Sequence, residues 1–340
     1  MKKILVAGAG GYVGSVMCRE FLKSGYHIVA LDRYFFGLEK LADLNEKNLT
    51  IIRDDIRYFD EDVLKDVDVV IDLAGLSNDA TSEIDPAFTK AINCDGSTRL
   101  ATLAKKNGVK HYLYSSSASV YGFSNIRYLS ETDKLNPLTE YSKSKVAVEN
   151  NLMALYDHNF NVTILRNSTI YGLSPRMRFD LAVNIMAMRG CTEGIIYIMG
   201  DGMQWRPFVH VKDVVAAFKL CMENPEAASG QIFNVGSNEQ NYAIGDLAVY
   251  ISGLLEDTKT IHIPDNQDCR SYSLDFSKIN KVLGYTTRYT VKDGVLEIKE
   301  ALKKGVITFD DPTTHTLNWY KTLLYWETKM NNLKVKDKIL

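Results

Sequence analysis

The residues that could perform acid–base chemistry include Tyr141 and Lys145, in the stretch Tyr-Ser-Lys-Ser-Lys that opens an expected helix. Side chains four positions apart share one face of a helix, about one turn from each other. An ammonium beside a phenol favours the phenolate and lowers the pKa of the phenol, which would make Tyr141 a usable base near neutral pH. A solvent-exposed Tyr–Lys face without chemistry is the alternative interpretation, because such pairs are common.

A second polar cluster lies in residues 114–122, where four serines follow the end of an expected strand. Hydroxyl groups at the carboxyl end of a parallel strand lie where such sheets bind their ligands. A Ser-rich loop that satisfies its own backbone is the alternative.

A glycine-rich turn, Gly-Ala-Gly-Gly-Tyr-Val-Gly in residues 8–14, joins the first expected strand to the first expected helix. Glycines at positions 8, 11 and 14 let the chain turn tightly and let a pyrophosphate approach the backbone. They also leave the amides at the helix N-terminus free to point at that anion. The alternative is a turn that needs small residues for its shape alone.

Asp32 ends the second expected strand, 18 residues after Gly14. An acidic side chain at that point would accept hydrogen bonds from both ribose hydroxyls of a dinucleotide. It would also repel a 2′-phosphate, so we expect the cofactor to be NAD rather than NADP. Arg33 follows directly and could instead contact a 2′-phosphate, which leaves NADP open at this point.

The elements that must position these residues alternate between short apolar runs and longer amphipathic stretches. We expect strands at 4–6, 27–31, 50–52, 67–73, 112–115 and 162–165, and helices at 12–23, 87–106 and 141–156. Strands without internal alternation, separated by helices, are typical of a parallel sheet covered on both faces. The sequence therefore predicts an α/β fold with a doubly wound parallel Rossmann sheet.

The pattern becomes less regular after residue 171. We expect strands at 208–209 and 232–235, the second of which could rejoin the main sheet, a helix at 314–329 and a solvated end at 334–338. These segments predict a second, smaller α+β lobe at the carboxyl edge of the sheet. The expected division is a cofactor domain of residues 1–171 plus 209–238 and a substrate lobe of residues 172–208 plus 239–340.

The composition excludes several classes of protein. The chain has 340 residues, 46% hydrophobic and 24% charged, with a formal net charge of −2. Such a chain can bury enough surface to fold, and the charge balance argues against nucleic-acid binding. No apolar run approaches the roughly 20 residues of a bilayer span, so we expect a cytoplasmic protein without membrane association. The five cysteines form no C-x-x-C pair and fit buried thiols in a reducing compartment: Cys18, Cys94, Cys191, Cys221 and Cys269.

Other chemistries lack their motifs. The six histidines show no H-E-x-x-H or comparable ligand spacing, so we expect no metal site. The chain also has no G-x-S-x-G nucleophile elbow and no G-x-x-x-x-G-K-[ST] phosphate-binding loop.

Taken in order, the motifs resemble those of the extended short-chain dehydrogenase/reductases, in particular the sugar-nucleotide epimerase/dehydratase group. The resemblance spans most of residues 1–240, and a weaker match follows in residues 268–278. Its segments are 8–14, 54–56, 73–75, 93–96, 115–122, 141–145, 165–166, 171–172 and 206–213.

The resemblance implies a role for each of these positions. Ser117, Tyr141 and Lys145 would be the catalytic triad. The implied NAD-binding residues are Gly8, Gly11, Tyr12, Val13, Gly14, Asp32, Arg33, Asp55, Ile56, Leu73, Ala74, Gly75, Asn93, Ser115, Tyr141 and Lys145. The implied residues for a nucleotide-diphosphate sugar are Ser117, Ser119, Asn167, Thr169, Arg206 and Arg270, with the two arginines clamping the diphosphate.

We expect epimerisation at carbon 4 through a transient keto sugar. Dehydratases of the group carry an Asp-Glu pair directly after the catalytic Ser or Thr, whereas here Ala118 and Ser119 follow Ser117. Thr169 and Pro207 depart from many 4-epimerases, which carry an Asn and more often an acidic residue there. A C4 dehydrogenase or ketoreductase with net cofactor turnover is therefore the alternative, and a non-catalytic dinucleotide-sensing protein is a third.

The resemblance also implies a homodimer, paired through the helices at 87–106 and 141–156. Val148, Leu152 and Leu155 fall at i, i+4 and i+7 of the second helix and could form an apolar contact stripe. A stripe that faces the protein's own core would explain the same spacing.

Overall fold

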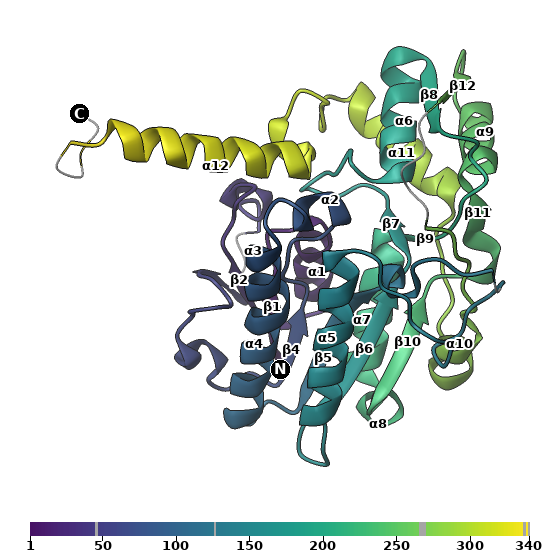
Figure 1. The fold of residues 1–340 in the computed structure, drawn as a ribbon. Coiled ribbons are helices and arrows are strands. Elements are labelled where there is room, and N and C mark those ends of the chain that lie inside the picture. Colours follow the sequence, from purple (N-terminus) through teal and green to yellow (C-terminus); the bar gives the residue numbers. More distant parts are fainter. Residues whose placement is uncertain (45–46, 126, 265–269, 336–337, 339–340) are drawn as a thin grey trace.

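The computed structural model describes residues 1–44, 47–125, 127–264, 270–335 and 338 (Figure 1). Its centre is a seven-stranded sheet in the order β10-β6-β5-β4-β1-β2-β3, with parallel pairing between neighbours. The strands are β1 (Lys3–Ala7), β2 (His27–Asp32), β3 (Leu49–Arg53), β4 (Val69–Asp72), β5 (His111–Ser117), β6 (Asn161–Asn167) and β10 (Gln231–Val235). The α/β fold class predicted from the sequence is confirmed, and the strand at 231–235 does join the main sheet.

Both faces of this sheet are buried, which explains its unbroken apolar runs. In β1, Ile4 and Val6 belong to one core cluster and Leu5 and Ala7 to another, and none of the four is exposed to solvent. Successive side chains of a strand point to opposite faces, so each face needs its own helical cover. The helices α1 (Tyr12–Lys23) and α7 (Val211–Glu223) pack together on one face.

The other face is covered by α5 (Glu140–Leu155) and by a composite helix. The single helix expected at 87–106 consists of α3 (Pro86–Thr89), a π-helical segment η3 (Lys90–Gly96) and α4 (Ser97–Lys106). Within η3, the Asn93 amide accepts a hydrogen bond from the Leu76 backbone N–H (2.7 Å) and donates to the Leu76 carbonyl (3.1 Å). The π-helical segment therefore ties the helix to the loop that follows β4.

The second half builds two small sheets and several helices at the carboxyl edge of the main sheet (Figure 1). One sheet joins β7 (Thr169–Tyr171), β9 (Trp205–His210) and β11 (Asn241–Ala243), and the other pairs β8 (Ile195–Met199) with β12 (Lys259–Ile263). The longer helices are α6 (Ala182–Glu193), α9 (Ile244–Leu254), α10 (Ser277–Leu283) and α11 (Val291–Lys303). β7 pairs with β9 of the small sheet and not with the main sheet. The division of the chain into a cofactor domain and a substrate lobe at residue 171 stays our proposal.

The last helix of the described residues is α12 (Thr316–Leu333), which begins two residues later than expected from the sequence. Its first turns lie against the body, and the rest projects away from it (Figure 1). The remaining short elements are α2 (Asp79–Ser82), α8 (Pro225–Ala228) and the 3-10 turns η1 (Leu38–Lys40), η2 (Glu61–Leu64), η4 (Ala118–Tyr121), η5 (Asn238–Gln240) and η6 (Pro312–Thr314).

Two sequence expectations concern the molecule as a whole. None of the helices in the described residues is long and apolar enough to cross a membrane. Cys18 and Cys221 are buried as expected, but Cys94 is only partly buried and Cys191 is exposed, so the expectation of uniformly buried thiols is wrong. Cys269 lies outside the described residues.

Candidate active site

One cavity of about 980 Å³ lies where several strands of the main sheet reach their carboxyl ends. Of the predicted site residues, all but Asn93 line it, including the glycine-rich turn, Arg206 and Arg270. Asn93 does not line the cavity itself, but its side chain is hydrogen-bonded to the backbone of Leu76, which does. The structure therefore brings together side chains that are up to 262 positions apart in the sequence, from Gly8 to Arg270.

The glycines of the turn have different reasons to be glycine. Gly8 has a φ of +82°, and a Cβ there would lie 2.9 Å from the backbone of Leu73 and Ala74. A Cβ on Gly14 would lie 2.1 Å from the Gly8 carbonyl oxygen, so both positions are required by close packing of the turn. Gly11 is the N-cap of α1 and provides no side-chain cap, and the first turn carries no acidic residue. The amides there remain available to an anion in the cavity, which fits a dinucleotide pyrophosphate.

Asp32 and Arg33, at the end of β2, are the residues expected to favour NAD and NADP, respectively. The Asp32 carboxylate accepts hydrogen bonds from the amides of Gly10 (2.9 Å) and Tyr34 (2.6 Å). The Arg33 guanidinium donates to Asp55 (2.9 Å). Burial by itself would raise the pKa of Asp55, but Arg57 and Arg33 together lower it to about 2. Arg33 is thus held by a carboxylate, and the acidic group at the end of β2 fits a ribose with free hydroxyls.

The three expected catalytic residues converge from two elements. Ser117 ends β5, whereas Tyr141 and Lys145 lie in the first turns of α5. A capping box formed by Thr139 and Ser142 fixes where α5 begins. The Lys145 ammonium donates to the Ser115 carbonyl (2.7 Å) and lies 5.6 Å from the centroid of the Tyr141 ring. The Ser119 hydroxyl donates to that of Ser117 at 3.0 Å.

Electrostatics correct one expectation about this cluster. Burial raises the pKa of Tyr141 to about 12, the hydrogen bond with Ser117 acts in the opposite direction, and the nearby Asp79 raises it further. Burial also lowers the pKa of Lys145 to about 8, against the attraction of Asp72 and Glu149. The sequence predicted that Lys145 would lower the phenol pKa, whereas desolvation is the larger effect here.

A buried ion pair lies directly behind the cluster and was not selected from the sequence. Arg166 of β6 donates to Glu149 of α5 (2.7 Å), with both side chains 4% exposed. Glu149 also accepts from the Ser116 hydroxyl (2.5 Å). These contacts link the strand that carries Ser117 to the helix that carries Tyr141, and they hold the two elements in one relative position.

Two predicted substrate residues follow the ion pair along the chain. The Asn167 amide donates to the Ser115 hydroxyl (3.0 Å), while its buried Oδ1 has no partner among the described residues. A buried acceptor on a cavity wall is satisfied when a ligand donates to it. Thr169 lies two residues on, in β7, and lines the same cavity.

The two arginines expected to clamp a diphosphate, Arg206 and Arg270, both line the cavity. Arg206 is 7% exposed, donates to the Trp205 carbonyl (2.7 Å), and places its guanidinium 5.2 Å from the Tyr272 ring. Arg270 forms an ion pair with Asp79 at the start of α2. Both arginines therefore reach the cavity and are held by protein groups there.

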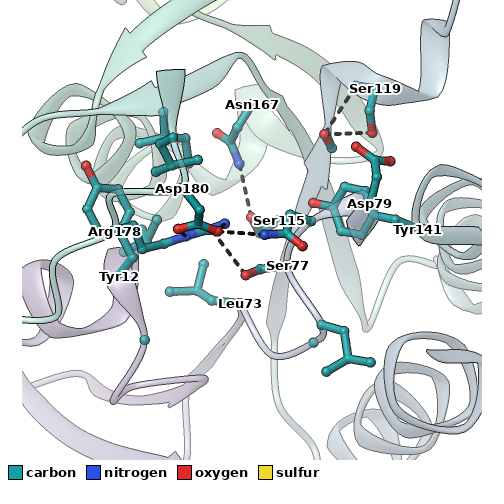
Figure 2. Close-up of a pocket in the computed structure, with 18 of the residues that line it drawn as sticks. Tyr12, Leu73, Ser77, Asp79, Ser115, Ser119, Tyr141, Asn167, Arg178 and Asp180 are labelled. Carbon is teal, nitrogen blue, oxygen red and sulfur yellow. Dashed lines mark hydrogen bonds and ion pairs between the residues drawn. The ribbon is translucent and has the colours of Figure 1, made fainter. Parts of the chain in front are cut away.

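One part of the cavity lining was missed from the sequence. It contains Arg176 and Arg178, in the loop that joins β7 to α6, together with Tyr320 of α12. Arg178 donates to both carboxylate oxygens of Asp180 (3.0 and 2.7 Å) and to the Ser77 hydroxyl at 3.1 Å (Figure 2). The available signal was the string Ser-Pro-Arg-Met-Arg-Phe-Asp at 174–180, which places two arginines just after the segment 171–172 of the resemblance.

Arg176 has unusual surroundings for a guanidinium. It is 2% exposed, lies 3.6 Å from the centroid of the Phe36 ring, and donates to the Thr316 hydroxyl at 2.9 Å. In the part of the chain that the structure describes, it has no carboxylate within ion-pair distance, and its Nε is buried without a partner. Burial lowers its pKa to about 9. A buried cation on a cavity wall is typical of a site for an anionic ligand group.

The acidic residues in the region bear on the type of reaction. Glu131 accepts a hydrogen bond from the Asn234 amide (2.7 Å), Asp133 accepts from Ser130 (2.7 Å), and neither lines the cavity. Asp79 does line it, beside the Tyr141 ring (Figure 2). Its two oxygens accept from Thr139 and from Arg270, so it is committed to an ion pair. No group of acidic, histidine or cysteine side chains in the described residues has the arrangement of a metal site.

Comparisons with known proteins agree with this geometry. The model of the NAD dependent epimerase/dehydratase family matches residues 4–236. The UDP-glucose 4-epimerase of Mycolicibacterium smegmatis is 30% identical over 310 residues, which cover 88% of this chain and 97% of that protein. The structure of MoeE5 in complex with UDP-glucose and NAD has a TM-score of 0.78 at 28% identity, covering 90% of this chain and 100% of that one. The UDP-glucuronic acid 4-epimerase of Bacillus cereus, in complex with UDP-glucuronic acid and NAD, has a TM-score of 0.79 at 26% identity, with 89% and 99% covered.

Proposed function

The chain belongs to the NAD-dependent epimerase/dehydratase family, and from that premise we propose that it epimerises a nucleotide sugar at carbon 4 through a transient keto sugar. The observation that carries the proposal is the convergence of Ser117, Tyr141 and Lys145 on the cavity that the glycine-rich turn lines. A hydroxyl, a phenol and an ammonium in one cavity are the groups that alcohol oxidation requires.

The nicotinamide of bound NAD supplies the hydride acceptor, and the residues of the chain perform the rest of the chemistry. Tyr141 takes the proton of the sugar hydroxyl at its phenol oxygen. Ser117 donates a hydrogen bond to the same sugar oxygen and stabilises the charge that develops on it. Lys145 places its ammonium 5.6 Å from the centroid of the Tyr141 ring, and a cation near a phenol favours the phenolate.

Two groups of residues would hold the cofactor. The backbone amides around Gly11 and the Arg176 guanidinium line the same cavity and would contact the pyrophosphate. Asp32 would accept hydrogen bonds from the adenosine ribose, with Asp55 and Ile56 beside the adenine. Because Arg33 is paired with Asp55, this arrangement favours NAD over NADP.

The nucleotide-diphosphate sugar would extend toward Arg206 and Arg270, whose guanidinium forks suit phosphate oxygens. Ser119, Asn167 and Thr169 line the same cavity and would contact the sugar. The UDP-glucose and UDP-glucuronic acid bound by the two similar structures support a nucleotide sugar as the class of substrate.

The proposal excludes 4,6-dehydration on chemical grounds. Elimination of a hydroxyl requires a second acid and base beside the phenol, and Ala118 and Ser119 provide none. Glu131 and Asp133 are engaged elsewhere, and Asp79 is paired with Arg270.

The experiment is to incubate the protein with a panel of nucleotide hexoses and follow the products by proton NMR. We expect a C4 epimer to accumulate to an equilibrium ratio without net change in NADH absorbance. The Tyr141→Phe variant run on the same panel is the control for contaminating activity. A 4-keto-6-deoxy product would overturn the argument against dehydration, and stoichiometric NADH formation or consumption would establish the dehydrogenase or ketoreductase alternative.

A further inference from the structure

The first turns of α12 border the cavity, although they come from a part of the chain that the family match does not reach. The match ends at residue 236, whereas the side chains of Leu317 and Tyr320 line the cavity. The acid–base chemistry proposed above uses neither of them. Their position therefore raises the question of which ligand group they meet.

Contacts on two sides hold this part of α12 in place. The buried Thr316 hydroxyl accepts a hydrogen bond from the Arg176 guanidinium (2.9 Å) and donates one to Asp180 (3.3 Å). On the other side, the indole N–H of Trp319 donates to the backbone carbonyl of Phe35 (2.6 Å). The start of the helix is thus tied both to the loop between β7 and α6 and to the segment that follows β2.

The ring of Tyr320 packs on that segment. Its centroid lies 5.7 Å from that of Phe35, with the planes at 84°, and 5.5 Å from that of Phe36, with the planes at 64°. Edge-to-face arrangements of this kind are favourable for aromatic pairs. Phe35 and Phe36 line the cavity and follow closely after Asp32, which would accept hydrogen bonds from the adenosine ribose. Tyr320 is therefore placed where the adenosine half of a dinucleotide would bind.

The hydroxyl of Tyr320 is a donor without a hydrogen-bond partner in the part of the chain that the structure describes. Burial raises the pKa of Tyr320 to about 12, the positive charge of Arg176 lowers it, and the negative charge of Asp32 raises it. The phenol is therefore protonated at neutral pH and lies within electrostatic reach of both charges. A polar group on a cavity wall that has no protein partner is satisfied when a ligand binds to it.

We propose that Tyr320 is a further cofactor-binding residue, which donates its phenol hydrogen to the adenosine-side phosphate of NAD and, with Leu317, covers the adenosine half of the cofactor. The inference rests on the proposed position of NAD, with the pyrophosphate at Arg176 and the ribose at Asp32. The adenosine-side phosphate joins that ribose to the rest of the pyrophosphate, so it belongs between the two charges that act on the phenol. A neutral phenol can bind a phosphate oxygen beside Arg176 without the repulsion that a second cation would introduce.

The contacts of α12 also predict how the cofactor leaves. Because Thr316 and Trp319 fix the start of the helix on two sides, the helix must loosen before a covered adenosine can be released. Loss of the contact should therefore appear mainly as faster dissociation, as is usual for changes at one binding interface.

The test is calorimetric titration of the cofactor-free protein with NAD. Tyr320→Phe keeps the ring that packs on Phe35 and Phe36 and removes only the hydroxyl, so NAD should bind about tenfold more weakly. Tyr320→Ala also removes the cover and should weaken binding at least about 30-fold, with faster release of NADH in stopped-flow fluorescence. Tyr325→Phe and Tyr325→Ala are the matched controls, because Tyr325 lies on the same helix, is 55% exposed and does not line the cavity. Both controls should bind NAD as the native protein does.

Titration with ADP-ribose locates the contact. This molecule keeps the adenosine and both phosphates and lacks the nicotinamide, so Tyr320→Phe should lose the same factor for ADP-ribose as for NAD. A loss confined to NAD would place Tyr320 at the nicotinamide and overturn the proposal. Native affinity for NAD in Tyr320→Phe would overturn it as well.

The titrations separate this inference from the proposed function, because they contain no sugar nucleotide. A protein that loses NAD affinity with Tyr320→Phe but forms no C4 epimer would contradict the proposed function and support the inference. Normal epimerisation together with native NAD affinity in Tyr320→Phe would contradict the inference alone. Circular dichroism and thermal unfolding check that each variant keeps its fold, and the isosteric Tyr320→Phe decides the outcome if Tyr320→Ala does not.

Discussion

The two walls of the cavity are built in different ways. The first wall consists of strand ends and helix starts between residues 8 and 145, and it presents backbone amides and hydroxyl groups beside charged side chains such as Asp32, Asp55 and Lys145. The second wall consists of the loop at 176–180 and the first turns of α12, and it presents two buried arginines. In the first wall, each motif except the Tyr141–Lys145 pair directly follows a strand. The second joins segments about 140 residues apart, through the contact of Arg176 with Thr316.

The comparison shows that the two walls compensate their buried polar groups in different ways. Amides and hydroxyls can line a cavity at little cost, because they satisfy one another or bind water. A buried guanidinium is stable only when partners or a ligand compensate its desolvation. Arg178 has Asp180 as its partner, whereas Arg176 has a hydroxyl and an aromatic ring. We therefore assign the chemistry to the first wall and much of the ligand affinity to the second.

The largest effect should come from the phenol on the first wall. Tyr141→Phe keeps the bulk of the ring and removes the atom that transfers the proton, so turnover should fall by at least about 10³-fold. NAD binding, measured by calorimetry, should change less than about threefold. Near-normal turnover in this variant would disprove the mechanism.

Ser117→Ala should have a smaller effect at the same wall. It removes one hydrogen bond to the reacting oxygen, and such a donor is worth about 10²-fold in turnover. Steady-state kinetics should show the loss in kcat more than in KM. The control is Ser119→Ala, because Ser119 donates to the Ser117 hydroxyl and would contact the sugar, so its removal should act on KM more than on kcat. If the control loses as much as Ser117→Ala, the assignment of the donor is wrong.

Lys145 should make the stability of the protein depend on pH. Its pKa is about 8 when folded, below its ordinary value of 10.5, so the unfolded chain binds more protons between these values. Stability from this group therefore rises with pH from about 8 to 10.5 and is independent of pH below that window. Denaturant titrations should show the native protein gaining about 2 kcal/mol relative to Lys145→Met between pH 8 and pH 10. A constant difference would mean that Lys145 keeps its ordinary pKa.

On the second wall, Arg176→Gln should weaken NAD binding about tenfold, since one charge-assisted contact to a phosphate is lost. Arg176→Lys should recover part of the affinity, because it restores the charge without the fork. Calorimetric titration of both variants measures this directly. If Arg176→Gln binds NAD with unchanged affinity, Arg176 does not contact the phosphate and only packs on Phe36.

The smallest effect should come from Arg33, the charge on the first wall that is already paired. Arg33→Gln should change the affinity for NAD by less than about threefold, because Asp55 retains Arg57 as a partner. The native protein should bind NAD more tightly than NADP, and the variant should keep that preference. Tighter binding of NADP by tenfold or more would show that Arg33, and not Asp32, selects the cofactor.

The sequence by itself determined the main sheet and the first wall of the site. The strands of the first half and α1 and α5 lie within two residues of their predicted bounds at almost every end. Their apolar runs are local signals, and in a doubly wound sheet the carboxyl ends of the strands meet at one edge. Gly8, Asp32, Ser117 and Tyr141 could therefore be assigned to one cavity before any coordinates were available. The π-helical segment around Asn93 could not, because its i→i+5 bonds leave no distinct apolar period.

Tertiary structure decided everything that depends on contacts between distant segments. Arg176 follows no strand-end motif, and its burial requires Phe36 and Thr316, which are 140 residues away on either side. The pairing of Arg33 with Asp55 depends on the adjacency of β2 and β3, and it removed an ambiguity that the residue types left open. The pKa of Tyr141 was predicted in the wrong direction for the same reason. The spacing of Tyr141 and Lys145 fixes their mutual approach, whereas desolvation depends on every element packed around them.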